Sequence, residues 1–388
     1  MKRNAVEQWL YLLTPAAAPL LLAAEEVGNA PSVAAIEKLR RDFDHEEVRL
    51  AIELLSARQV ARRKFPNRMD ILCDRSGAEQ ASSALAADWK AERFGNNAVV
   101  DLCCGIGGDA MSLAARGPTV GVDHSPERAA MCSHNAGIKT EIGDVTSIEL
   151  NAPLVHIDPA RRDEATGQRR WSLDMLEPGL EAIASVIKKV EGGAVKLGPG
   201  LARDAELPFG ETSIEFLAEG NSIVQSIAWF GTLATPGVLR RASDVVARVT
   251  VEGVPERPMC FSSVGRFLLV PHVAVERAEL MPTALGSIVA GELAPGLGIL
   301  TCDAPTETHW FEAFEVLDVL SPRLSKVKSW LREHDAGRVV VRTRDQAVDA
   351  DTWTRTLQGE GSTEIVLFVL RLGKKVVVIA THRSSSTP

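Results

Sequence analysis

The chain has 388 residues and a net charge of −8; 45% of its residues are hydrophobic and 24% are charged. This composition is typical of globular proteins, and the length indicates two or three domains that bury their cores without disulfides. The acidic balance argues against binding nucleic acid through the charge of the whole surface, but it leaves room for a local basic patch.

The cysteines and the apolar runs narrow the class of protein further. The six cysteines form no Cys-x-x-Cys pair, and no His/Cys set has zinc-ligand spacing, so we expect free thiols in a reducing cytoplasm and no bound metal. No stretch approaches the roughly 18 uncharged apolar residues that span a membrane. Pro15 and Pro19 interrupt the apolar N-terminal run, which therefore predicts two helices rather than a signal peptide. The oligomeric state stays open.

Residues 1–94 have the pattern of a helical domain. Apolar side chains recur at helical spacing from Val33 to Arg63, and the run ends at Phe65-Pro66-Asn67. Ser76-Gly77 then precedes another predicted helix, at residues 78–94.

From Asn97 the pattern changes to short apolar strands that alternate with helices. The predicted strands are residues 98–100, 119–122, 154–157 and 194–197, and the predicted helices are residues 110–115, 126–136 and 176–189. This alternation predicts an α/β fold with a doubly wound, mostly parallel sheet. Residues 212–217 and 223–230 follow as a predicted hairpin at the sheet edge.

The last third of the chain predicts a small α+β module. Proline and glycine become frequent beyond about residue 236, and a predicted helix at residues 322–334 precedes predicted strands at residues 339–341, 365–370 and 375–379. We therefore expect three domains, at residues 1–94, 95–265 and 266–388.

A glycine loop follows the first predicted strand of the sheet. The segment from Asp101 to Asp109 contains Gly105 and Gly107, which let the backbone turn tightly beside a ligand, and Cys103 belongs to the same loop. With Ala110 the glycines also satisfy a dinucleotide fingerprint. An acid at the position of Asp101 is badly placed beside a pyrophosphate, but it suits the cationic amino end of S-adenosylmethionine.

Two further carboxylates follow the next predicted strands. Asp123 can accept hydrogen bonds from ribose hydroxyls, in S-adenosylmethionine or NAD alike. Asp144, with Val145 beside it, is placed to accept the adenine amino group. One carboxylate per strand–helix unit predicts a nucleoside site.

Asp158-Pro159-Ala160-Arg161-Arg162 follows the fourth strand and resembles the Asp-Pro-Pro-aromatic motif of methyltransferases that act on exocyclic amino groups of bases. An amide-like nitrogen is a poor nucleophile, and acceptors on its two N–H groups localise its lone pair towards the methyl group, so position supplies most of the rate. We assign catalytic roles to Asp158, Pro159 and Arg161. Ala160 and Arg161 depart from that motif; an arginine can stack on a base, grip phosphate or form a structural ion pair.

Other basic residues predict contact with RNA phosphate. Lys196 closes the fifth strand at the same rim, and Arg162 follows the Asp158 motif. Arg62, Arg63 and Lys64 belong to a helix face without acids, which is either a solvated surface or a phosphate contact.

The chain resembles class I S-adenosylmethionine-dependent methyltransferases that carry a THUMP-like C-terminal domain. The matching segments are residues 57–66, 79–83, 87–91, 101–109, 158–162, 196–200, 314–320 and 373–375. The section from Asp101 to Arg162 is also similar to cap-guanosine N2 methyltransferases, without the aromatic residue that stacks on guanine there.

This resemblance implies a class I methyltransferase Rossmann-like sheet, an N-terminal helical domain and a THUMP-like α+β domain. It implies S-adenosylmethionine as cofactor, RNA as substrate, and Gln80 and Ser82 folding over the cofactor pocket. Three other functions stay open: methyl transfer to a small molecule or protein, a non-catalytic S-adenosylmethionine-binding protein associated with RNA, and a nicotinamide oxidoreductase, which Asp101 disfavours.

Overall fold

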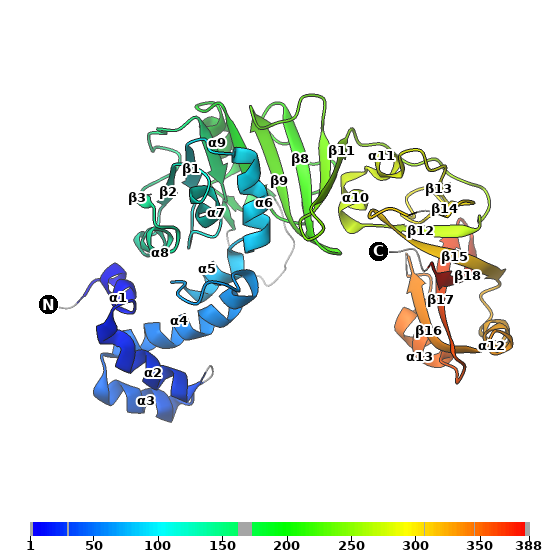
Figure 1. Ribbon diagram of the computed structural model, residues 1–388, viewed down its shortest axis with the longest axis horizontal. Coiled ribbons are helices and arrows are strands. Elements are labelled where there is room, and N and C mark those ends of the chain that lie inside the picture. Colours follow the sequence, from blue (N-terminus) through cyan, green and yellow to red (C-terminus); the bar gives the residue numbers. More distant parts are fainter. Residues whose placement is uncertain (1–2, 29–30, 162–172, 306, 345, 385–388) are drawn as a thin grey trace. The chain divides into compact units, whose positions relative to one another are not determined.

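The computed structural model describes residues 3–28, 31–161, 173–305, 307–344 and 346–384 (Figure 1). Two compact units make up the chain, Met1–Leu239 with Ser243–Val249 and Arg240–Ala242 with Thr250–Pro388. All predicted site residues fall in the first unit.

The first unit begins with helices, as predicted. These are α1 (Ala5–Tyr11), a short 3-10 turn (Pro15–Ala17), α2 (Ala18–Val27), α3 (Val33–Asp42), α4 (His45–Lys64), α5 (Arg75–Gln80) and α6 (Ala84–Phe94). Five of them start at a side chain that accepts a hydrogen bond from the first turn, namely Asn4, Ser32, Asp44, Asp74 and Ser83. No single helix among the described residues is long and apolar enough to cross a membrane; α1 and Pro15–Val27 meet that test only as a pair bent by 80°.

Helices α1 to α5 share a core that also reaches the predicted cofactor loop. Leu20, Val48, Leu54 and Ile71 are buried in this core, and Ile106 of the glycine loop packs into it. The helical segment therefore fixes one side of the loop by hydrophobic burial.

A nine-stranded sheet follows, in the order β11-β10-β8-β9-β7-β4-β1-β2-β3. Its strands are β1 (Val99–Leu102), β2 (Thr119–Asp123), β3 (Lys139–Ile142), β4 (Leu154–Ile157), β7 (Gly192–Leu197), β8 (Thr212–Glu219), β9 (Ser222–Gly231), β10 (Arg240–Asp244) and β11 (Val249–Gly253). Strands β3, β2, β1, β4 and β7 run parallel, and β9 joins β7 antiparallel. The connecting helices are α7 (Ala110–Ala114), α8 (Pro126–Ala136) and α9 (Leu180–Ile187).

Helix α6 packs over one face of this sheet (Figure 1). Phe94 of α6 shares a core with Val99, Leu113 and Trp229. The loops at the carboxyl ends of β1 and β4 therefore follow strands that are packed into this core.

Three predicted elements differ from the structure. The single helix expected at residues 78–94 is interrupted at residues 81–83, between α5 and α6. The helix expected at residues 176–189 is shorter, because Leu176–Glu177 (β6) pairs with Ala160–Arg161 (β5) and α9 begins only after Gly179. The hairpin β8–β9 does not form the edge of the sheet, because β10 and β11 continue the sheet beyond β8.

The second unit contains a seven-stranded sheet in the order β13-β14-β12-β15-β18-β17-β16. Its strands are β12 (Phe267–Pro271), β13 (Gly291–Glu292), β14 (Leu300–Cys302), β15 (Phe311–Leu320), β16 (Ala336–Thr343), β17 (Thr363–Leu372) and β18 (Lys375–Arg383), and its helices are α10 (Val273–Ala278), α11 (Met281–Leu285), α12 (Leu324–Glu333) and α13 (Ala350–Leu357). Val327, Trp330 and Leu357 of the helices bury against Ile365 and Leu367 of the sheet. The predicted α+β module is confirmed.

Candidate active site

The carboxyl ends of the parallel strands bring most predicted site residues to one edge of the sheet. Asp101 on β1 lies in register with His156 on β4 and Gly121 on β2, and β4 pairs with β7, which carries Lys196. In open α/β sheets this edge is where ligands bind.

The glycine loop turns in left-handed backbone conformations. The φ angles are +58° at Cys103, +54° at Gly105 and +87° at Gly107. A Cβ atom on Gly107 would lie 3.1 Å from Cα of Cys132, whereas one on Gly105 would meet nothing within 4 Å. The loop is therefore pressed against α8 at Gly107 and open at Gly105.

Replacing Gly107 with alanine is expected to lower the free energy of unfolding by about 1–3 kcal/mol, because a strained φ and a close approach to the backbone of Cys132 add up. Gly105→Ala is the matched variant, because it adds the same methyl group at a positive φ without a clash. Urea denaturation of both proteins measures the difference. Equal losses would mean that the contact with Cys132 is of no consequence.

Asp123 ends β2 and holds the glycine loop. Its buried carboxylate accepts hydrogen bonds from the backbone N–H of Gly105 and of Ser125, both at 2.9 Å. A carboxylate has about four acceptor positions, so capacity remains for ribose hydroxyls.

Asp144 occupies an exposed turn after β3. Its Oδ1 accepts from the backbone N–H of Thr146 at 2.8 Å and from its hydroxyl at 2.7 Å, and these bonds lower the pKa of Asp144. The adjacent Val145 is buried. The turn is held by its own residues, and the predicted contacts to adenine stay predictions.

A buried network of polar side chains lies behind the glycine loop, and the sequence did not predict this network. Nδ1 of His156 lies 2.7 Å from Oδ1 of Asp101, and its Nε2 lies 3.5 Å from Nζ of Lys90. Lys90 in turn forms a 2.6 Å ion pair with Asp109. Ser82 Oγ donates to Asp109 at 2.8 Å and accepts from Gln225 at 2.8 Å.

Burial and charge shift the pKa values of the groups in this buried network in different directions. Burial raises the pKa of Asp101, against the opposing effect of His156. Burial lowers the pKa of Lys90. Burial alone would raise the pKa of Asp109, but Lys90 and His156 outweigh it and hold that pKa below its ordinary value.

Asp158 at the end of β4 is paired with Lys196. Lys196 Nζ donates to Asp158 Oδ2 at 2.7 Å and to the carbonyl of Gln80 at 3.2 Å. The Asp158 side chain keeps 28% of its surface exposed, and Pro159 is buried. Asp158 is therefore a reachable carboxylate at the rim, already in contact with one cation.

Lys64 brings the end of α4 to the same rim. Its Nζ donates to the carbonyls of Glu79 and Ala81, both at 2.6 Å. Burial, followed by the positive charge of Lys196, lowers the pKa of Lys64. Two lysines thus hold the turn after α5, where Gln80 is exposed and Ser82 is buried.

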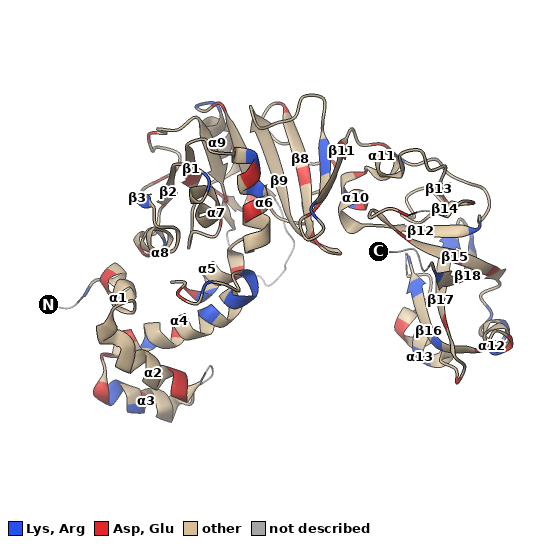
Figure 2. Ribbon diagram, in the orientation of Figure 1, with Lys and Arg blue, Asp and Glu red and all other residues tan. Residues whose placement is uncertain are grey.

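The remaining predicted residues fall into two groups. Arg62 and Arg63 are exposed on the last turn of α4, which is blue in Figure 2. The backbone of Arg161 lies in β5, while its side chain and all of Arg162 lie outside the described residues.

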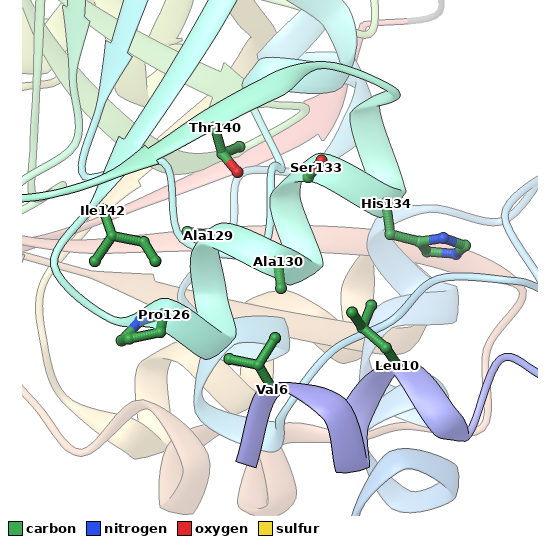
Figure 3. A pocket seen from close by; sticks show the side chains of 9 residues that line it. All are labelled: Val6, Leu10, Pro126, Ala129, Ala130, Ser133, His134, Thr140 and Ile142. Carbon is green, nitrogen blue, oxygen red and sulfur yellow. The ribbon is translucent and has the colours of Figure 1, made fainter. Parts of the chain in front are cut away.

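A shallow groove of about 440 Å³ lies elsewhere on the first unit, between α1 and α8 (Figure 3). It is lined by Val6, Leu10, Pro126, Ala129, Ala130, Ser133, His134, Thr140 and Ile142. None of the predicted site residues lines it, and its walls are mostly apolar. We therefore place the candidate chemistry at the strand ends and not in this groove.

Comparison with known proteins identifies the C-terminal module and the fold. Residues 311–383 match the family model described as THUMP domain-like, which confirms the predicted THUMP-like domain. A candidate methyltransferase from Porphyromonas gingivalis W83 superposes with a TM-score of 0.73 over 95% of this chain and 99% of that chain, at 16% identity. The chain therefore has a methyltransferase fold followed by a THUMP-like domain.

Other comparisons are weaker. Magnesium protoporphyrin IX methyltransferase from Synechocystis PCC 6803, solved with bound S-adenosylmethionine, covers 48% of this chain and 96% of its own length at 15% identity, with a TM-score of 0.29. A candidate RNA methyltransferase from Pyrococcus horikoshii covers 29% of this chain and 58% of its own length at 20% identity, with a TM-score of 0.23. Neither carries an argument. No curated protein matches the chain by sequence.

Proposed function

We propose that the chain is an S-adenosylmethionine-dependent methyltransferase that acts on RNA, with an exocyclic amino group of a base as the acceptor. The observation that carries this proposal is a buried carboxylate oxygen at the glycine loop. Oδ2 of Asp101 has no hydrogen-bond partner, although the side chain is 1% exposed. A buried acceptor without a donor is costly, and the ammonium group of S-adenosylmethionine would satisfy it.

The residues around Asp101 fit the rest of this cofactor. Gly105 leaves backbone open to a ligand, and Asp123 keeps acceptor positions for a ribose. S-adenosylmethionine supplies an activated methyl group when bound. Asp144, Val145, Cys103, Gln80 and Ser82 complete the proposed pocket.

The proposed role of Asp158 is to orient the acceptor. Its carboxylate and a nearby backbone carbonyl, in the Asp158-Pro159 turn, would accept the two N–H bonds of the amino group. This aligns the nitrogen lone pair with the methyl group, and the amine can lose its proton after transfer. Lys196 holds the carboxylate at 2.7 Å and so fixes its orientation.

The proposed RNA contacts are basic side chains beside this rim. Arg62 and Arg63 are exposed and directly precede Lys64, whose Nζ reaches the same turn as Lys196. Arginine and lysine contacts to phosphate make binding strongly dependent on salt. The division into domains at residues 1–94, 95–265 and 266–388 belongs to the proposal, with the THUMP-like domain as a second RNA contact.

One observation favours a second candidate. Because Lys196 already pairs with Asp158, an acceptor amine has to compete with an ammonium group, and Ala160 and Arg161 depart from the Asp-Pro-Pro-aromatic motif. A non-catalytic protein that binds both S-adenosylmethionine and RNA would show this arrangement too. It would bind the cofactor without transferring a methyl group.

Calorimetry with S-adenosylmethionine and with NAD tests the proposal. We expect S-adenosylmethionine to bind and Asp123→Ala to weaken it by about tenfold or more, because the variant loses both the ribose acceptor and the anchor of Gly105. Glu149→Ala, which removes an exposed carboxylate of the same unit, should bind like the wild type.

Incubation of total RNA with tritiated-methyl cofactor then tests transfer. RNA labelling that falls steeply with salt is expected. Labelling of protein or small molecules alone would favour the alternative acceptors, binding without labelling would favour the non-catalytic protein, and binding of NAD alone would overturn the proposal.

A further inference from the structure

In the buried polar network behind the glycine loop, Oδ1 of Asp109 is held by its ion pair with Lys90, and two oxygen atoms have no hydrogen-bond partner, Oδ2 of Asp101 and Oε1 of Gln225. The members of this network are between 0% and 6% exposed: Gln225, Ser82, Asp109, Lys90, His156 and Asp101. Buried charges are retained only where they are paired and hydrogen-bonded. Each donor in this network is therefore expected to have an acceptor, and each charge a partner.

The ammonium group of Lys90 forms an ion pair with Asp109 and lies within hydrogen-bonding distance of Ser82 and His156. Its Nζ lies 2.6 Å from Asp109 Oδ1, 3.1 Å from Ser82 Oγ and 3.5 Å from His156 Nε2. An ammonium group has no acceptor, so Nε2 of His156 accepts and carries no proton. Nδ1 of His156 then bears the proton and donates to Oδ1 of Asp101 at 2.7 Å. Lys90 thus sets the tautomer of His156.

The charges in this buried polar network do not cancel. Lys90 balances Asp109, and His156 in this tautomer is neutral. Asp101 is left with a negative charge and with Oδ2 as an acceptor without a donor. One ammonium group would supply both the missing charge and the missing donor.

We propose that Lys90 and His156 are positioning residues that orient Asp101 for the ammonium group in the amino-acid part of the cofactor. His156 occupies Oδ1 and turns Oδ2 towards the ligand, and Lys90 holds His156 in the donating tautomer. This inference rests on the proposed function, because it needs S-adenosylmethionine or its product at the glycine loop.

Two ligands separate this role from a general structural one. S-adenosylhomocysteine carries the amino-acid part, whereas 5′-methylthioadenosine lacks it and keeps the nucleoside. Calorimetry measures the affinity of the wild type and of His156→Leu for both ligands. His156→Leu is expected to lower the affinity for S-adenosylhomocysteine by about tenfold or more, since it removes a charge-assisted hydrogen bond to Asp101. The affinity for 5′-methylthioadenosine should stay within about twofold.

Further variants keep the test decisive if His156→Leu does not fold. His156→Asn retains a donor near the position of Nδ1 and is expected to recover part of the lost affinity. Lys90→Met should also lower the affinity for S-adenosylhomocysteine more than the affinity for 5′-methylthioadenosine. His134→Leu, at an exposed histidine on α8, serves as the matched control, and thermal unfolding checks each protein.

The outcomes distinguish this inference from the proposed function. If the His156 variants lowered the affinity for both ligands equally, or for neither, the positioning role alone would be overturned. Failure of both ligands to bind the wild type would overturn the proposed function and this inference with it.

Discussion

Replacing Asp109 with alanine is expected to lower the free energy of unfolding by about 3–5 kcal/mol, because it leaves a buried charge without its partner. Lys90 is 1% exposed, and Asp109 is its only counter-ion within 4.0 Å among the described residues. Alanine also removes the acceptor of the Ser82 hydroxyl. Urea denaturation of the full chain measures the loss.

Two further variants show whether the stability lost in Asp109→Ala comes from the buried ion pair. Asp88→Ala removes an exposed carboxylate from α6, on the same helix as Lys90. It loses one hydrogen bond from the Ser112 hydroxyl but no buried ion pair, and should therefore cost far less. Lys90→Met combined with Asp109→Leu replaces both charges with apolar groups and should recover most of the stability. A single Asp109→Ala variant as stable as Asp88→Ala would contradict the buried ion pair.

The contribution of Asp109 should depend on pH with a definite sign. Its pKa in the folded chain lies below the ordinary value of 3.8. A depressed pKa stabilises the folded state above the unfolded value and loses this effect as the pH falls towards the folded value. The difference in stability between wild type and Asp109→Ala should therefore be full above about pH 4 and shrink below it.

Local signals in the sequence predicted the elements that they specify. The helix expected at residues 126–136 begins and ends as in the structure, because Pro126 follows the Ser125 cap and Gly137 takes a left-handed φ of +67°. The strand at residues 154–157 is likewise confirmed. In contrast, β10 and β11 extend the sheet through pairing between distant segments, and no local pattern reveals that pairing.

The same distinction applies to the candidate site. Asp101 and Asp123 stand out because each carboxylate directly follows apolar residues of a short strand. The link from His156 to Lys90 spans 66 residues of sequence, and Ser82 meets Asp109 across 27. The one available signal was the polar His156 inside an apolar strand, since a buried imidazole requires partners. Ser82, predicted to contact the cofactor, has its hydroxyl within this buried polar network, so its role towards the ligand stays a prediction.

Replacing Asp158 with asparagine is expected to reduce methyl transfer to RNA by about 100-fold or more and to leave the affinity for S-adenosylmethionine within about twofold. Asparagine keeps the shape of the side chain but loses its charge. It cannot hold Lys196 as an ion pair, and it offers one acceptor oxygen where the carboxylate offers two. A single-turnover assay with tritiated-methyl cofactor measures the rate on the RNA fraction that the wild type labels.

The split between rate and affinity is what identifies Asp158 as a group that touches the acceptor. Glu149→Gln makes the same chemical change at an exposed carboxylate and should leave both quantities unchanged. If Asp158→Asn weakened cofactor binding as much as it slowed transfer, Asp158 would belong to the cofactor pocket, because only interactions that strengthen in the transition state act on the rate alone. If transfer were unchanged, the Asp158–Lys196 pair would be a structural contact, and the acceptor would be oriented by other residues at the rim.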